Sequence, residues 1–138
     1  MIKTEIYISG YRWFAIVFFP VDRLDRDEIC EALECIGCSD DVLSDIGPIN
    51  SGMTYSNTNM MSSVVVIGMA STGDEYSNTI AHEIAHLATH ISSKYGIETG
   101  SEQYCSLIGD IAMELNHISK NLVSDCKCAK GKVMSMVR

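Results

Sequence analysis

The chain has 138 residues, of which 46% are hydrophobic and 20% charged, and its formal net charge is −8. This length fits one domain with a single core, and the composition is that of a globular rather than a disordered protein. The surplus of negative charge opposes binding to nucleic acid or to an anionic membrane surface, so we expect neither as a partner. The apolar run over residues 13–19 is too short to span a bilayer.

The amino terminus and the cysteines bear on the cellular compartment. Glu5 stands where a secretory signal would carry basic residues, so we expect a cytoplasmic protein with reduced thiols or thiolate metal ligands. Cys30 and Cys105 lie on apolar helical faces and are expected in the core. An alternative role, a second zinc bound by four thiolates, stays open for Cys35, Cys38, Cys126 and Cys128.

The first predicted elements are a hairpin and a helix. Residues 2–8 alternate between apolar and polar, and residues 11–19 follow after Ser9-Gly10, which predicts a β-hairpin. Because its second half is continuously apolar, we expect that strand to be buried on both faces and to end at Pro20. A capping pair at Asp25 and Glu28 then predicts a helix that closes at Gly37. Its inward residues would be Ile29, Ala32, Leu33 and Ile36.

The middle of the chain predicts two strands and a long helix. Residues 38–63 are rich in Ser, Asn, Asp and Gly and contain one short strand at about 53–58. Residues 64–69 form a strongly β-prone run. A capping box from Thr72 to Glu75 starts a helix that reaches about Tyr95 and ends at Gly96.

A last helix and a tail complete the predicted domain. Ser101 can cap the helix, because apolar residues recur at helical spacing after it. These residues are Tyr104, Leu107, Ile108, Ile111, Leu115, Ile118 and Leu122. We therefore expect one α+β domain over residues 1–124, with a mixed or antiparallel sheet of three to four strands, an N-terminal helix and two C-terminal helices. Residues 125–138 form a basic tail that we expect to be flexible.

The long helix carries the sequence His82-Glu83-Ile84-Ala85-His86. His82 and His86 are one helical turn apart on one face, so both imidazoles can bind one zinc ion. Glu83 lies one step around the helix, where it can reach a water on the metal without being a ligand. A carboxylate in that position can act as the general base when the water attacks a carbonyl.

A catalytic zinc usually has a third protein ligand. Thr89 and Ser92 occupy the positions of the Gly and His of the metzincin extension, which excludes that arrangement. His90 lies a further ~6 Å along the helix axis, too far to complete a tetrahedron with the other two histidines. The remaining candidates are Glu98, Glu102, Asp110 and Glu114.

The path of the last helix decides between these acids. A strictly antiparallel return would bring Asp110 level with the two histidines, whereas a steeper crossing would bring Glu102 to the metal. From the residues alone, both alternatives stay open.

The motif resembles that of the zincin metallopeptidases, particularly the gluzincin-like branch. It is also similar to small zincin-like proteins encoded by phages of gut Bacteroidetes. The similar stretches are 64–69, 78–86 and 102–109. The resemblance implies one zinc bound by His82, His86 and Glu102, with Glu83 as the base, and it implies that residues 64–69 form an edge strand to which an extended peptide can add. Cys105 departs from the small Ala that is usual at its position.

These observations predict a zinc-dependent metallohydrolase, most simply a peptidase with a peptide or protein substrate. A protease that cleaves one specific repressor would have the same site. The alternative is a zincin-fold phage protein with little or no turnover, which would act as a structural or partner-binding module. Such a protein would self-associate or bind virion proteins, in the host-cell cytoplasm or in the virion.

Overall fold

In the part of the chain that the structure describes, four strands form one mixed sheet in the order β1-β2-β4-β3. The structure is a computed structural model that describes residues 2–21, 26–38, 52–69 and 71–125. β1 (Ile2–Ile8) and β2 (Trp13–Val21) pair antiparallel, β2 pairs parallel with β4 (Ser62–Gly68), and β3 (Gly52–Asn57) pairs antiparallel with β4. Three helices accompany the sheet among the described residues, which confirms the predicted α+β class.

The predicted hairpin is confirmed, with two differences. A single turn of 3-10 helix, η1 (Ser9–Tyr11), connects β1 to β2. The second strand does not end at Pro20 but continues to Val21, with a register shift between Phe18 and Val21. Such an irregularity tolerates a proline, which has no N–H to give to the ladder. The predicted burial on both faces is wrong at Phe14, which is 41% exposed.

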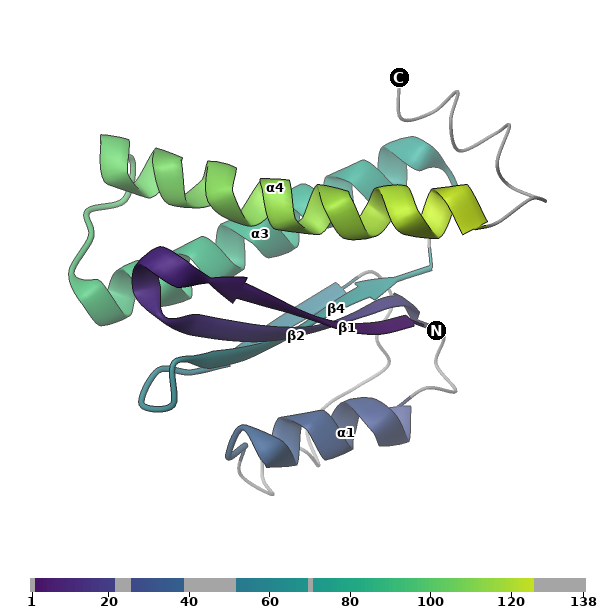
Figure 1. Ribbon diagram of the computed structural model, residues 1–138, viewed down its shortest axis with the longest axis horizontal. Coiled ribbons are helices and arrows are strands. Elements are labelled where there is room, and N and C mark those ends of the chain that lie inside the picture. Colours follow the sequence, from purple (N-terminus) through teal and green to yellow (C-terminus); the bar gives the residue numbers. More distant parts are fainter. Residues whose placement is uncertain (1, 22–25, 39–51, 70, 126–138) are drawn as a thin grey trace.

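The sheet lies between two helical layers (Figure 1). The helix α1 (Arg26–Cys35) covers one face, and α3 (Gly73–Tyr95) and α4 (Glu102–Asp125) lie on the other. The α1 side is a small core in which the predicted inward residues of the helix are buried. Its members are Phe18, Ile29, Ala32, Leu33, Ile36, Cys38, Val64 and Val66.

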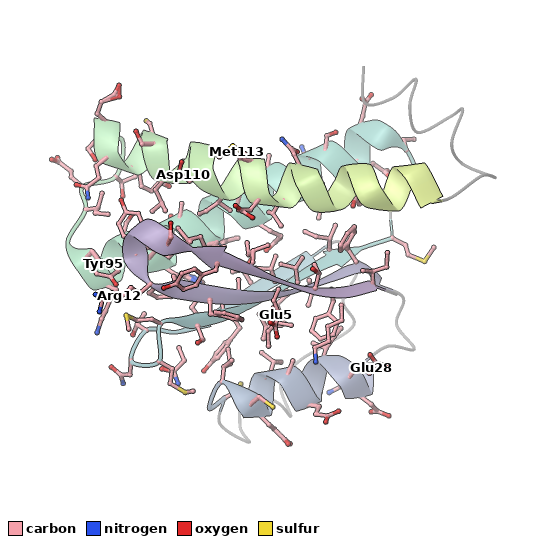
Figure 2. All side chains as sticks on the ribbon, viewed as in Figure 1. Glu5, Arg12, Glu28, Tyr95, Asp110 and Met113 are labelled. Carbon is pink, nitrogen blue, oxygen red and sulfur yellow. The ribbon has the colours of Figure 1, made fainter. Side chains whose placement is uncertain are left out.

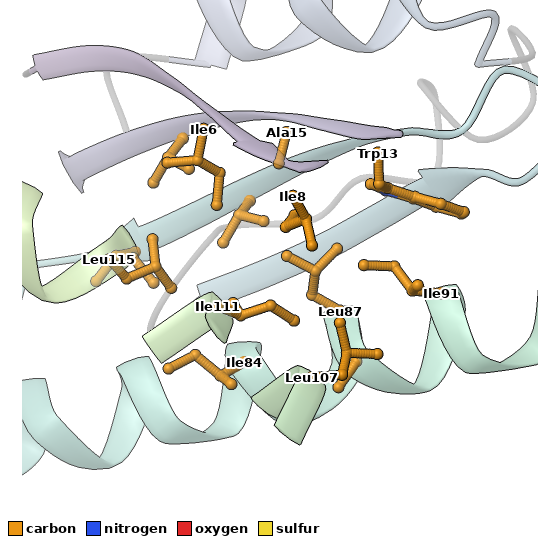
Figure 3. Close-up of a cluster of buried hydrophobic side chains, with 14 of the residues drawn as sticks. Ile6, Ile8, Trp13, Ala15, Ile84, Leu87, Ile91, Leu107, Ile111 and Leu115 are labelled. Atoms are coloured by element: carbon orange, nitrogen blue, oxygen red, sulfur yellow. The ribbon is translucent and has the colours of Figure 1, made fainter. Parts of the chain in front are cut away.

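The larger core lies between the sheet and the two long helices (Figure 3). Side chains from β1 and β2 meet apolar residues that recur at helical spacing on α3 and α4. The labelled members are Ile6, Ile8, Trp13, Ala15, Ile84, Leu87, Ile91, Leu107, Ile111 and Leu115. This packing fixes which face of α3 turns toward the sheet, and therefore the direction of its polar side chains.

The ends of the long helices follow their predicted signals. Thr72 caps α3 by accepting a hydrogen bond from the Glu75 N–H at 3.1 Å, and the Glu75 carboxylate accepts one from the Ser71 N–H at 2.9 Å. Gly96 ends the helix in the left-handed region with φ 67°. At the start of α4, Ser101 accepts a hydrogen bond from the Tyr104 N–H at 3.2 Å. Both ends of α3 and the start of α4 are therefore set by local sequence.

The predicted edge strand is wrong. Residues 64–69 fall largely within β4, which lies between β2 and β3 and is buried along nearly its whole length. A strand that is apolar on both faces has to be covered on both sides, and this favours a central position. The strand at the edge of the sheet beside β4 is β3. No helix in the described part of the chain has an apolar stretch long enough to cross a membrane.

Candidate metal centre and general base

His82 and His86 lie one turn apart on α3, and both side chains are exposed. Their rings meet edge to face, with centroids 4.7 Å apart and an interplanar angle of 72°. The two Nε2 atoms approach to 3.1 Å. At this distance the two rings can share one hydrogen bond. The Nε2 of one imidazole carries the proton and donates it, and the Nε2 of the other is unprotonated and accepts.

The same geometry fits a shared metal ion. Two Zn–N bonds of about 2.0–2.1 Å at a tetrahedral angle place their nitrogens about 3.3 Å apart. The observed separation of 3.1 Å between the Nε2 atoms differs little from that value. The two imidazoles could therefore bind one zinc ion with small side-chain adjustments, and the donor type is one that zinc prefers.

Glu83 is the buried member of the motif, with 3% of its surface exposed. It follows His82 by one residue, so its side chain leaves α3 about 100° further around the helix, toward β3. There its Oε1 accepts a hydrogen bond from the Thr54 hydroxyl at 2.7 Å. A carboxylate with so little exposure needs polar partners, and Thr54 supplies one from the edge strand.

Gly52 provides the space for this carboxylate. A Cβ at position 52 would lie 2.8 Å from Oε2 of Glu83 and 2.9 Å from the Val66 carbonyl oxygen. Both distances are shorter than a side-chain carbon can tolerate, and the second involves backbone of the central strand β4. The absence of a side chain at Gly52 therefore allows Glu83 to rest directly against β3.

His90 continues the histidine ladder but has a different environment. Its Nδ1 lies 2.6 Å from the Ser56 hydroxyl on β3, and its ring centroid lies 6.3 Å from that of His86. Burial lowers the pKa of His90, the charge on His86 lowers it further, and the charge on Glu83 opposes both. The residue therefore faces the edge strand on the same side of α3 as Glu83.

The acids proposed as third ligand lie on or before α4. The Tyr104 and Thr89 hydroxyls are 3.2 Å apart, which puts the first turn of α4 beside the turn of α3 that follows His86. Glu102 lies in that first turn and is exposed. Asp110 is exposed on the side of α4 that also carries Met113 (Figure 2).

The described part of the chain contains no three His, Cys, Asp or Glu side chains close enough together to share a metal. The structure thus brings together His82 and His86, and it does not bring Glu102 or Asp110 into a group with them. Glu102 as the third ligand stays a prediction.

The cysteines divide between core and surface. Cys38 is buried and Cys30 partly buried, whereas Cys35 and Cys105 are exposed, so the expected burial of Cys105 is wrong. All four are free thiols. Cys126 and Cys128, which a four-thiolate site would require, lie outside the described residues.

Comparison with known proteins identified no relative of this chain. No family model, no curated protein and no solved structure matches the chain. The site is therefore interpreted from its own geometry.

Several residues around the site were not predicted from the sequence. Gly52, Thr54 and Ser56 alternate along β3 and share the face that looks toward α3. Three small or polar residues at a spacing of two are unusual for a face covered by a helix. That pattern is the sequence signal that would have indicated a polar contact there.

Proposed function

We propose that the chain is a zinc-dependent hydrolase of the zincin type that cleaves peptide bonds. One observation carries the proposal. The Nε2 atoms of His82 and His86 converge to 3.1 Å, while Glu83, which lies between them in sequence, is buried against the edge strand. Burying a carboxylate beside two exposed histidines costs free energy, so its place in the motif favours a functional over a stabilising role.

His82 and His86 are the residues that would hold the zinc, with Glu102 as the proposed third ligand. A zinc ion at this position supplies a positive charge that polarises a carbonyl and makes water more acidic at neutral pH. Glu83 accepts the proton of the attacking water and passes it to the leaving amine. The Thr54 hydroxyl donates to Oε1 and so holds the carboxylate in place for this role.

The substrate would lie along β3 rather than along β4. Among the residues that the structure describes, β3 is the last strand on its side of the sheet, and its Thr54 and Ser56 contact Glu83 and His90. An extended peptide can pair with the outer edge of such a strand through main-chain hydrogen bonds. The scissile bond would then lie beside the outer edge of β3, close to the motif residues of α3.

Metal binding and turnover test the proposal together. Dialysed protein should bind one zinc per chain in a calorimetric titration, and His82→Ala and His86→Ala should each weaken binding by at least 100-fold. Ser93→Ala, an exposed change on the same helix, is the matched control and should bind as the parent does. Glu102→Gln and Asp110→Asn compare the two candidate third ligands.

The zinc-loaded protein should also cleave members of a mixed-sequence peptide library, as read by mass spectrometry. Wild-type zinc affinity in both histidine variants would contradict the proposed site. Bound zinc without any cleaved peptide would contradict the hydrolase.

A second candidate function is a module that binds a partner through apolar surface. The favouring observation is the pair Tyr7 and Phe14 on the hairpin, which are 48% and 41% exposed with ring centroids 5.8 Å apart. Sedimentation velocity of the parent and of Phe14→Ser tests it. Self-association that the substitution removes would support this function, and a monomer at all concentrations would contradict self-association through this pair.

A further inference from the structure

A line of hydrogen bonds runs from the core to the motif helix. Trp13, which is fully buried, donates from Nε1 to the Ser63 hydroxyl at 2.8 Å. The Ser63 and Ser56 hydroxyls lie 2.6 Å apart, and the Ser56 hydroxyl lies 2.6 Å from Nδ1 of His90. The line therefore crosses β2, β4 and β3 and ends on α3, one turn beyond His86.

The direction of the protons follows from the first donor. An indole N–H can only donate, so the Ser63 oxygen accepts from Trp13. If Ser63 donates to Ser56 and Ser56 donates to His90, every hydroxyl proton in the line has an acceptor. In the reverse direction Ser63 would accept twice, and its own proton would have no partner among the hydrogen bonds of the described residues. Buried hydroxyls avoid that state, which favours the first direction.

This direction selects one tautomer of His90. Its Nδ1 accepts from Ser56, so in the neutral ring Nε2 carries the proton. A metal could bind Nε2 only if its proton moved to Nδ1, and that position already accepts a hydrogen bond from Ser56. His90 therefore presents a hydrogen-bond donor, not a third imidazole ligand, to the side of α3 that faces the edge strand.

We propose that His90 is a substrate-binding residue whose Nε2–H donates to a main-chain carbonyl oxygen of the bound peptide. Trp13, Ser63 and Ser56 are the positioning residues that hold its tautomer. The inference rests on the proposed peptidase function for the identity of its ligand, but the tautomer does not depend on that function.

The geometry also indicates which part of a peptide His90 would bind. His90 lies about 9 Å along the helix axis from the midpoint of His82 and His86. An extended chain covers that length with between two and three residues. The bound carbonyl would therefore belong to a residue two or three positions from the scissile bond, which makes His90 a determinant of substrate length.

Two-bond proton–nitrogen correlation spectra of the histidine rings test the tautomer directly. In metal-free protein above pH 7, His90 should show an unprotonated Nδ1 and a protonated Nε2. Ser56→Ala should return His90 to the mixture of tautomers of a free imidazole. Ser62→Ala is the matched control, because its hydroxyl bonds the Met60 carbonyl outside the line. A protonated Nδ1 in the parent protein would overturn the inference.

Zinc titration separates this inference from the proposed function. His90→Gln should bind zinc within twofold of the parent, and the Nε2 proton of His90 should persist in the zinc-loaded protein. Loss of that proton on zinc addition would show that His90 is a ligand and would overturn the inference. Unaltered zinc binding in His86→Ala would instead contradict the proposed metal site and leave the tautomer result standing.

Steady-state kinetics tests the contact with substrate. His90→Phe, which keeps a planar ring but has no N–H, should raise KM about five- to tenfold with little change in kcat, because the lost hydrogen bond is equally present in ground and transition states. The difference should disappear for peptides that are shortened so that they end before the contacted carbonyl. Equal KM values of parent and variant on the long peptide would overturn the proposed contact.

Discussion

The Glu83 carboxylate on α3 accepts a hydrogen bond of 2.7 Å from the Thr54 hydroxyl on β3, across 29 positions of sequence. This contact joins the motif helix to the edge strand and leaves only 3% of Glu83 exposed. It orients the carboxylate independently of any metal. The acid of the motif is therefore already in a fixed position before a ligand arrives.

Glu83→Gln should abolish hydrolysis and leave zinc bound. The amide keeps the shape of the side chain but cannot accept the proton of water, so we expect a loss of at least about 100-fold in kcat. Rates on a cleaved peptide and zinc content measured on the same samples check this. Glu31→Gln changes an exposed acid on α1, on the opposite face of the sheet, and serves as the control. A Glu83→Gln protein as active as the parent would show that the mechanism is wrong.

Gly52→Ala should displace Glu83. The added Cβ would lie 2.8 Å from Oε2 and 2.9 Å from the Val66 carbonyl, so either the carboxylate or the sheet has to move. We expect a destabilisation of about 1–3 kcal/mol in urea unfolding, with a fall in kcat. Gly109→Ala is the control, since a Cβ there meets nothing within 4 Å and should stabilise the helix by about 0.5–1 kcal/mol. Equal unfolding midpoints for Gly52→Ala and the parent would refute the close contact.

Thr54→Val should destabilise the fold by about 1–3 kcal/mol, because it leaves a buried carboxylate oxygen without its donor. The replacement keeps the shape of the side chain and removes only the hydroxyl. Thr54→Ser restores the donor and should recover most of the loss in the same chemical-denaturation experiment. If Val and Ser variants were equally stable, the hydrogen bond to Glu83 would contribute nothing.

Acid should destabilise the folded protein partly through His90. Burial lowers its pKa below the ordinary value of 6.5, so the folded chain holds this proton less tightly than the unfolded chain does. The resulting contribution is present above that ordinary value and is lost as the pH falls below it. Metal-free parent should therefore lose more unfolding free energy than His90→Gln between about pH 7.5 and pH 5.5. Parallel losses in the two proteins would contradict the buried, neutral state of His90.

Most of the helices and strands could be predicted because the residues that begin and end them are close together in sequence. The Thr72 cap, the Gly96 terminator and the periodic apolar residues of α3 and α4 depend on neighbours in sequence. The order of strands does not. The resemblance predicted residues 64–69 at the edge, whereas their continuous apolar character indicates the centre, and the structure agrees with the residues.

The candidate site also has a part that could be predicted from local sequence and a part that could not. His82, Glu83 and His86 follow from spacing on one helix, and so does their relative direction. Gly52, Thr54 and the Trp13–Ser63 contact join segments up to 50 positions apart, and single-sequence patterns do not contain such pairings. The identity of the third ligand could not be predicted from the residues for the same reason, because it depends on how α3 and α4 cross.

The measurement that tests the central claim most directly is diffraction from a zinc-soaked crystal at the zinc absorption edge. We predict one anomalous peak per chain, with both Nε2 atoms of His82 and His86 about 2.0–2.1 Å from it. The Glu83 carboxylate should remain against Thr54, and the same map identifies the third ligand. A zinc peak away from these two histidines, or none at a saturating concentration, would contradict the account.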